Sequence, residues 1–233
     1  MPKIVALGDK AVLVEFAETL DLAVNLRVQR LARAIGERRA PWLRDLVPAL
    51  ASLALHFDRA RLPRGATPAA LAAALIDECL AAPLPDLDAL TRTVELPVCY
   101  DERFAPDLRE VAERCGLAPV EVAARHAASA HRVLMVGFVP GHPYIGGLDP
   151  ALSVPRRPTP RPRVPTGSIA IANAQTVVYP YPTPSGWSLI GRTPERLFDV
   201  AREPAALLAP GDRVRFVPID AAEFERRLHA TAE

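Results

Sequence analysis

The chain has 233 residues, of which 50% are hydrophobic and 24% charged, a composition typical of globular proteins and not of disordered or fibrous ones. Its formal net charge of +1 gives no reason to expect nucleic acid or an anionic membrane as a partner. Lys3 and Lys10 are the only lysines, so the sequence excludes a phosphate-binding loop that ends in Gly-Lys-Ser/Thr and, beyond position 10, a Schiff-base lysine.

Residues 1–82 predict a small α+β domain in which the order strand-strand-helix occurs twice. Its first two strands are expected around the turn residues Gly8-Asp9, and Asp21 is expected to begin the first helix. Two short apolar segments near 45–50 and 53–58 predict the next strands, and Thr67-Pro68 predicts the start of the second helix. We therefore expect a four-stranded sheet with two helices on one face, in the order ββαββα.

Residues 83–90 are rich in proline and predict a linker to a second domain over 91–233. The second domain is expected to begin with a strand at 93–99 and two helices that open at Pro106 and Pro119, the first of them ending at Gly116. The pattern then favours strands at 133–139, 168–178, 187–191 and 212–217, and a last helix from Asp220. Many short strands with proline- and glycine-rich connections favour a barrel or a sandwich.

Two segments of this second domain are candidates for a binding site. The first, GFVPGHPYIGGLDP at 137–150, is a glycine-rich loop whose backbone permits close approach of a ligand. The second, PRRPTPRPRVPTGS at 155–168, would place Arg157, Arg161 and Arg163 on one face if it were extended. Such a row of guanidinium groups suits a carboxylate or a phosphate. A solvated linker or a proline-motif ligand is the alternative interpretation.

The third candidate segment, QTVVYPYPTPSGWSLIGRTP at 175–194, has several polar residues but no recognisable nucleophile and base. These polar candidates are Gln175, Ser185, Trp187, Arg192 and Thr193. The sequence therefore names no catalytic residue.

Metal and membrane sites are not expected. The three cysteines are widely spaced, and His126 and His131 lie five residues apart, too far round a helix to share a metal. The start of the chain has no signal-peptide core, and the proline-free uncharged run at 166–179 is too short to span a bilayer as a helix. We expect a soluble cytoplasmic protein.

The three segments, in this order, resemble the KipI family. Members of this family are also called the B subunit of 5-oxoprolinase or allophanate hydrolase subunit 1. The family is related to the carboxyltransferase part of urea carboxylase. LGDKAVLVEF near the start, SLALHFD in the middle and LLAPGDRVRFVPI near the end fit as well, so the resemblance covers nearly the whole chain. His142 stands where the family usually has an aromatic residue such as Phe. The resemblance implies a small α+β domain followed by a cyclophilin-like β-barrel domain.

The resemblance also implies a function. It is that of one subunit of a 5-oxoprolinase, which opens 5-oxo-L-proline to L-glutamate with ATP as co-substrate and with partner subunits A and C. We expect the chain to be inactive alone and to contact a small cyclic amide through Tyr144, Gly146, Gly147, Arg157, Arg161, Arg163, Gln175 and Arg192. The alternatives are a regulatory protein that inhibits a sensor histidine kinase, as KipI is named for, and an allophanate hydrolase-type subunit. A prolyl isomerase would rest on the barrel fold alone.

Overall fold

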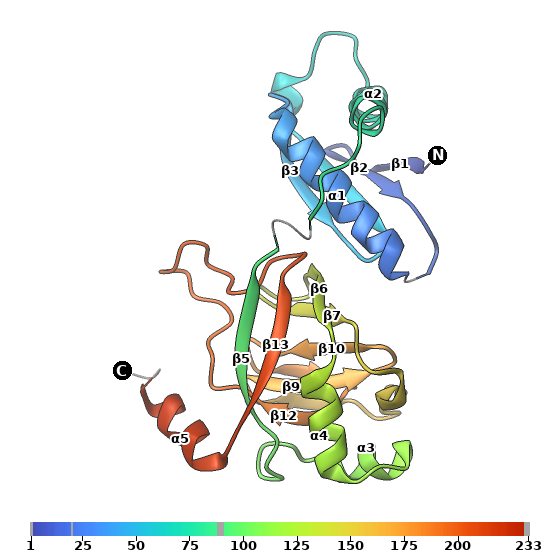
Figure 1. The fold of residues 1–233 in the computed structure, drawn as a ribbon. Coiled ribbons are helices and arrows are strands. Elements are labelled where there is room, and N and C mark those ends of the chain that lie inside the picture. The colour runs from blue at the N-terminus through green and yellow to red at the C-terminus, as the bar shows by residue number, and fades with distance from the viewer. Residues whose placement is uncertain (1, 20, 88–90, 231–233) are drawn as a thin grey trace. The chain divides into compact units, whose positions relative to one another are not determined.

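This computed structural model divides into two compact units, Met1–Thr91 and Arg92–Glu233 (Figure 1). Each unit has its own hydrophobic core, and the second also holds a smaller apolar cluster that includes Tyr179 and Trp187. The structure describes residues 2–19, 21–87 and 91–230. Residues 88–90 of the expected linker therefore lie outside the described residues. Each unit is described by itself below.

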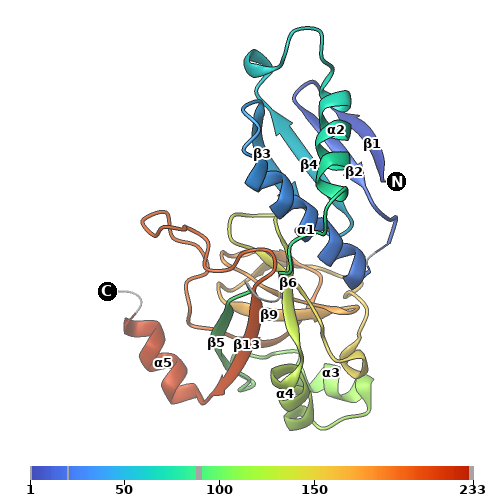
Figure 2. The same ribbon diagram turned by 45° about the horizontal axis from the view of Figure 1, so that its top comes forward.

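The first unit is a four-stranded antiparallel sheet with two helices on one face (Figure 2). Along the chain come β1 (Lys3–Leu7), β2 (Ala11–Glu15), α1 (Leu22–Arg38), β3 (Leu43–Pro48), β4 (Ser52–Phe57), a 3-10 turn (Arg59–Arg61) and α2 (Pro68–Leu80). Both expected helix caps are confirmed, because Asp21 accepts a hydrogen bond from the backbone N–H of Ala23 at 2.7 Å and Thr67 accepts one from Ala70 at 3.3 Å. These local signals set where each helix begins.

The second unit is a closed seven-stranded barrel in the order β10-β7-β6-β13-β5-β12-β9, accompanied by a two-stranded sheet of β8 and β11. Its strands are β5 (Thr93–Cys99), β6 (His131–Val136), β7 (Pro143–Gly146), β8 (Arg161–Val164), β9 (Ser168–Ala172), β10 (Gln175–Val178), β11 (Thr183–Ser185), β12 (Ser188–Arg192) and β13 (Arg213–Ile219). Its helices are α3 (Leu108–Cys115), α4 (Pro119–Ala128), a 3-10 turn (Pro150–Leu152) and α5 (Ala221–Ala230). The parallel pair β5 and β13 lies side by side in Figure 1.

One predicted strand is two strands. The expected strand 168–178 is the hairpin of β9 and β10, which turns at Asn173. Asn173 has a φ of 52°, in the left-handed region that asparagine tolerates better than most residues. Because apolar residues continue on both sides of Asn173, the sequence pattern does not show the turn between the two strands. The hairpin places Tyr179 after β10 rather than inside a long strand.

A buried aspartate ties the arginine segment to the barrel. The side chain of Asp107, 4% exposed, accepts hydrogen bonds from both terminal nitrogens of Arg161, at 2.8 and 2.5 Å, and from Nη1 of Arg157 at 3.2 Å. It also accepts the backbone N–H of Leu189 in β12 at 2.7 Å. Arg157 contacts Glu110 of α3 at 2.7 Å in addition. Because charged, bidentate hydrogen bonds are the strong ones, this carboxylate fixes the path of residues 157–161.

A second buried polar group lies between α4 and the barrel. The His126 ring hydrogen-bonds the Tyr100 hydroxyl at 2.7 Å and the Thr176 hydroxyl at 3.2 Å, and its backbone carbonyl accepts from Nε2 of His131 at 2.8 Å. Both imidazoles are buried, and this burial lowers the pKa of His126 well below its usual value and also lowers that of His131. Both rings are therefore held uncharged in the folded state.

We expect Asp107→Asn to lower the free energy of unfolding by about 3 kcal/mol, because it leaves the partly buried guanidinium of Arg161 without a counter-charge and Arg157 with Glu110 alone. Urea denaturation followed by circular dichroism measures this loss. Glu102→Gln is the matched control, since it removes one carboxylate from an exposed pair with Arg109 and should change stability little. Equal effects of the two substitutions would contradict a structural role for Asp107.

We also expect the chain to lose stability as the pH falls from 6.5 to 5. In the unfolded chain a histidine takes up a proton near pH 6.5, whereas folded His126 and His131 resist it, so the unfolded state binds more protons in this range. The slope should approach ~1.4 kcal/mol per pH unit for His126, whose pKa lies well below its usual value, and His131 should add to it. His126→Gln should flatten this dependence, and an unchanged slope in that variant would show that other groups cause it.

Candidate functional site

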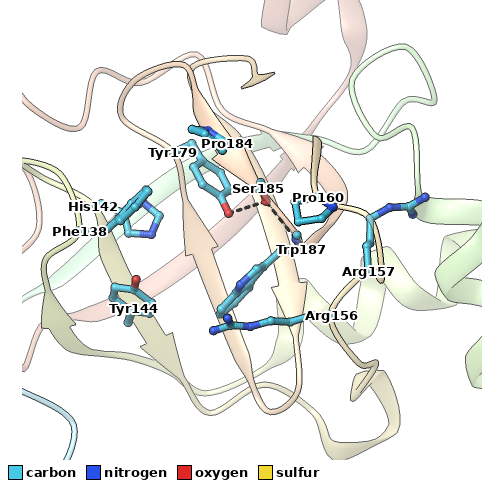
Figure 3. Close-up of a pocket in the computed structure, with 11 residues that line it drawn as sticks. Phe138, His142, Tyr144, Arg156, Arg157, Pro160, Tyr179, Pro184, Ser185 and Trp187 are labelled. Carbon is cyan, nitrogen blue, oxygen red and sulfur yellow. Dashed lines mark hydrogen bonds between the residues drawn. The ribbon is translucent and has the colours of Figure 1, made fainter. Parts of the chain in front are cut away.

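The three segments identified from the sequence meet at one pocket of 310 Å³ in the second unit (Figure 3). Residues 137–150 contribute Phe138, His142 and Tyr144, residues 155–168 contribute Arg156, Arg157 and Pro160, and residues 175–194 contribute Tyr179, Pro184, Ser185, Gly186 and Trp187. Aromatic rings and a small number of polar groups converge in this pocket, as they do in many small-molecule sites. This pocket is therefore the candidate functional site.

Aromatic rings form one side of the pocket, and His142 lies in their centre. Its ring centroid is 5.5 Å from that of Phe138 and 5.0 Å from those of Tyr144 and Tyr179. Burial lowers the pKa of His142 to about 4, against a hydrogen bond with the backbone of Val178. His142 is thus an uncharged ring at neutral pH, although its buried Nδ1 has no hydrogen-bond partner among the described residues.

Two hydroxyl groups stand on the pocket wall formed by β11 and the segment after β10. The Tyr179 hydroxyl and Ser185 Oγ are hydrogen-bonded to each other at 2.7 Å, and Ser185 Oγ also accepts the backbone N–H of Trp187 at 3.0 Å (Figure 3). Burial raises the pKa of Tyr179, against the effect of its hydrogen bond with Ser185, so the phenol stays protonated at neutral pH. The wall therefore carries O–H groups and no fixed charge.

The neighbouring arginines 156 and 157 point in different directions. The guanidinium carbon of Arg156 lies 5.7 Å from the centroid of the Trp187 ring, a cation–π contact, whereas Arg157 is directed away toward α3 (Figure 3). Arg156 has no ion pair among the described residues, while Arg157 is paired with Asp107 and Glu110. Arg156 therefore supplies the cation that the pocket can offer to a ligand.

The predicted site residues are only partly brought together. Tyr144 and Arg157 line the pocket, and Arg161 lies next to Arg157 on Asp107. Arg163 lies two residues after Arg161 in β8, but it is exposed and has no ion pair within the described part of the chain.

Arg192 and Gln175 lie elsewhere in the barrel. Nε of Arg192 donates to the carbonyl of Thr166 at 2.8 Å, and its guanidinium lies over the Phe224 ring, where burial lowers its pKa. Gln175 begins β10, and its buried Nε2 has no hydrogen-bond partner among the residues described. Neither residue lines the pocket.

The two predicted glycines support the barrel beside the pocket. Gly146 ends β7 and pairs with Arg132 of β6. Gly147 has a φ of 84°, and a Cβ there would stand 2.2 Å from the carbonyl oxygen of Ala130. Glycine is thus required at position 147 by both conformation and space.

Sequence reasoning missed Arg156, His142 and Tyr179 as parts of the site. Arg156 lies outside the face shared by the odd-numbered arginines, so the period-two pattern did not select it. A usable signal was the adjacent pair Arg156-Arg157, because two neighbouring side chains on an extended backbone point to opposite sides. One of them faces the carboxylate of Asp107 and the other faces the pocket.

The described residues contain neither a metal site nor a membrane-spanning helix. Among residues 2–19, 21–87 and 91–230, no three His, Cys, Asp or Glu side chains are arranged so that they could hold a metal ion. Within the same ranges, no helix combines the length and the apolar character needed to cross a membrane. Cys79, Cys99 and Cys115 are free thiols.

Comparison with known proteins identifies relatives over nearly the whole chain. The family model of the carboxyltransferase domain, subdomain C and D, matches residues 2–208. Three curated relatives, 38–42% identical, are named as the B subunit of 5-oxoprolinase. The one from Bacillus subtilis (strain 168) is 40% identical over 223 residues, which cover 94% of this chain and 93% of that protein.

Solved structures show the same fold. The crystal structure of TTHA0988 matches 91% of this chain with a TM-score of 0.77 and 39% identity, and this chain spans 40% of the length of that one. Urea carboxylase of Kluyveromyces lactis matches 97% of this chain with a TM-score of 0.72 and 20% identity, over 22% of its own length, and so shares the fold. The matched residues 2–208 contain every residue that lines the pocket. This chain belongs to the family of the carboxyltransferase domain, subdomain C and D, together with the proteins named as the B subunit of 5-oxoprolinase.

Proposed function

We propose that this chain is the B subunit of an ATP-dependent 5-oxoprolinase, which opens 5-oxo-L-proline to L-glutamate together with partner subunits. The observation that carries the proposal is the 40% identity, over 94% of this chain, to a protein that bears this name. The pocket adds support, because it combines aromatic walls with a single unpaired cation, Arg156. A small ring that bears one carboxylate suits such a site.

The proposed reaction explains why ATP is needed. The carbonyl carbon of a lactam is a poor electrophile, because the ring nitrogen shares its electron pair with the carbonyl. Transfer of the terminal phosphoryl group of ATP to the amide oxygen would make that carbon reactive and would release ADP. Attack by one water and cleavage of the ring C–N bond, with a proton to nitrogen, give a glutamyl phosphate. A second water then hydrolyses this acyl phosphate to glutamate and phosphate, so one ATP and two waters are consumed per ring opened.

We propose that ATP is used by the assembled complex with subunits A and C, and not through a lysine-bearing phosphate-binding loop of this chain. Both lysines of this chain lie within its first ten residues, which excludes a Gly-Lys-Ser/Thr phosphate-binding loop. The fold proposed with this function is a ββαββα domain followed by a cyclophilin-like barrel, and the assembly would work in the cytoplasm, where ATP is available.

The proposed roles of the arginines differ from one another. Arg157 and Arg161 act as positioning residues, since their contacts with Asp107 hold the segment that presents Arg156. Arg163, Arg192 and Gln175 lie outside the pocket. Contacts of these three residues with substrate remain predictions from the sequence. We assign no general base and no activating group for the attacking water to this chain.

The test is co-expression of this chain with the products of genes adjacent to its own, followed by an assay for glutamate release from 5-oxo-L-proline. We expect ATP-dependent release by the assembled complex and none by this chain alone. Omission of ATP, and omission of each subunit in turn, are the controls.

Three results would contradict the proposed function. Turnover by the purified chain alone would contradict its role as one subunit among several. A stable complex that hydrolyses allophanate but not 5-oxo-L-proline would favour the allophanate hydrolase-type alternative. Inhibition of a sensor histidine kinase, without turnover of either compound, would favour the regulatory one.

A further inference from the structure

The hydroxyl pair on the pocket wall has one proton more than its own hydrogen bonds use. Tyr179 and Ser185 carry two O–H protons, and their mutual hydrogen bond at 2.7 Å uses one of them, whichever oxygen donates. The bond from the backbone N–H of Trp187 fills an acceptor position on Ser185 Oγ and takes up no hydroxyl proton. One O–H therefore remains without an acceptor among the described residues.

This spare donor belongs to the pocket and is shielded from bulk water. Tyr179 is 3% exposed and Ser185 is 5% exposed, and both residues line the pocket. A buried donor without an acceptor is costly, and it is satisfied when a ligand brings an acceptor. The ligand should thus carry an oxygen acceptor at this wall.

The second recognition element is the guanidinium of Arg156. The cation–π contact with Trp187 restrains it beside the pocket, and no carboxylate of the described residues neutralises it. A planar guanidinium that is already ordered binds a carboxylate with two parallel hydrogen bonds at low entropic cost. His142 is uncharged at neutral pH and adds no second cation.

We propose that this pocket binds the cyclic amide with its carboxylate on Arg156 and its amide oxygen on the spare proton of the Tyr179–Ser185 pair. This inference rests on the proposed function, and it names the residues of this chain that would select the substrate. Because either hydroxyl can supply the proton, loss of one of them leaves a donor in place. Specificity for the amide oxygen is lost when both are removed.

Titration of the full chain with three ligands tests each half of the proposal. 5-Oxo-L-proline carries both groups, 2-pyrrolidinone lacks the carboxylate, and cyclopentanecarboxylate lacks the amide. We expect 5-oxo-L-proline to bind at least about tenfold more tightly than either analogue, as measured by calorimetry. Arg156→Ala should abolish the advantage over 2-pyrrolidinone, and Tyr179→Phe/Ser185→Ala should abolish the advantage over cyclopentanecarboxylate.

The controls separate recognition from folding. Arg44→Ala removes the same charge from an exposed position in the first unit and should leave all three affinities unchanged. Tyr179→Phe alone retains the serine proton and should keep most of the preference for the amide. If the double variant does not fold, the infrared carbonyl band of 5-oxo-L-proline bound to the unaltered chain replaces it, and a shift to lower frequency is expected on hydrogen bonding.

Several outcomes would overturn the inference. The first is that the unaltered chain binds 5-oxo-L-proline and either analogue with equal affinity. The second is that Arg156→Ala and Tyr179→Phe/Ser185→Ala still bind 5-oxo-L-proline more tightly than both analogues. If the isolated chain binds none of the three ligands, the same variants are compared in the assembled complex, where unchanged KM values for 5-oxo-L-proline would count against the proposal. A complex that is active with unchanged KM values leaves the proposed function standing while this inference fails.

Discussion

The carboxylate of Asp107 is the interaction on which the pocket depends. It accepts hydrogen bonds from Arg157 and Arg161, some 50 positions later in the chain, and from the backbone of Leu189 in β12. Three of residues 155–160 are proline, which has no N–H to donate, and the backbone hydrogen bond from Arg157 to the carbonyl of Gly186 at 2.7 Å is not continued there as a strand ladder. The buried carboxylate therefore fixes the position of residues 155–160, whereas backbone hydrogen bonds between strands fix the other parts of the barrel. Its hydrogen-bonding capacity is well used, which is the condition under which a buried carboxylate is tolerated.

This arrangement also separates the arginines of the segment into paired and unpaired ones. Two guanidinium groups are used by acidic partners in the fold, and the next one, Arg156, stays available over Trp187. The pocket thus receives one cation rather than a cluster, among rings that carry no charge at neutral pH. A site of this kind favours a small, singly charged ligand over a polyphosphate, which would need several cations or a metal ion.

The features predicted correctly from sequence are those set by near neighbours. Asp21 and Thr67 cap helices through residues two or three positions away, and Gly116 ends α3 in the left-handed conformation that its lack of a side chain permits. The three segments of the site were also predicted, from their glycine and proline content. The pairing within the site was not, because the partner of Arg157 and Arg161 lies on a different element. A row of arginines has the same local pattern whether it awaits a ligand or an aspartate of its own chain.

The parallel pair of β5 and β13 has a consequence for how the protein is made. It joins residues 120 positions apart, as Thr93 with Arg213, and runs to the ends of both strands. The barrel therefore cannot close until almost the whole chain has left the ribosome, whereas the sheet of the first unit uses strands that all lie between Lys3 and Phe57. Synthesis of the intervening residues leaves β5 with an unpaired edge for several seconds at the usual rate of translation. A nascent chain stalled before Arg213 should expose that edge, and this is the stage at which a chaperone would be most useful.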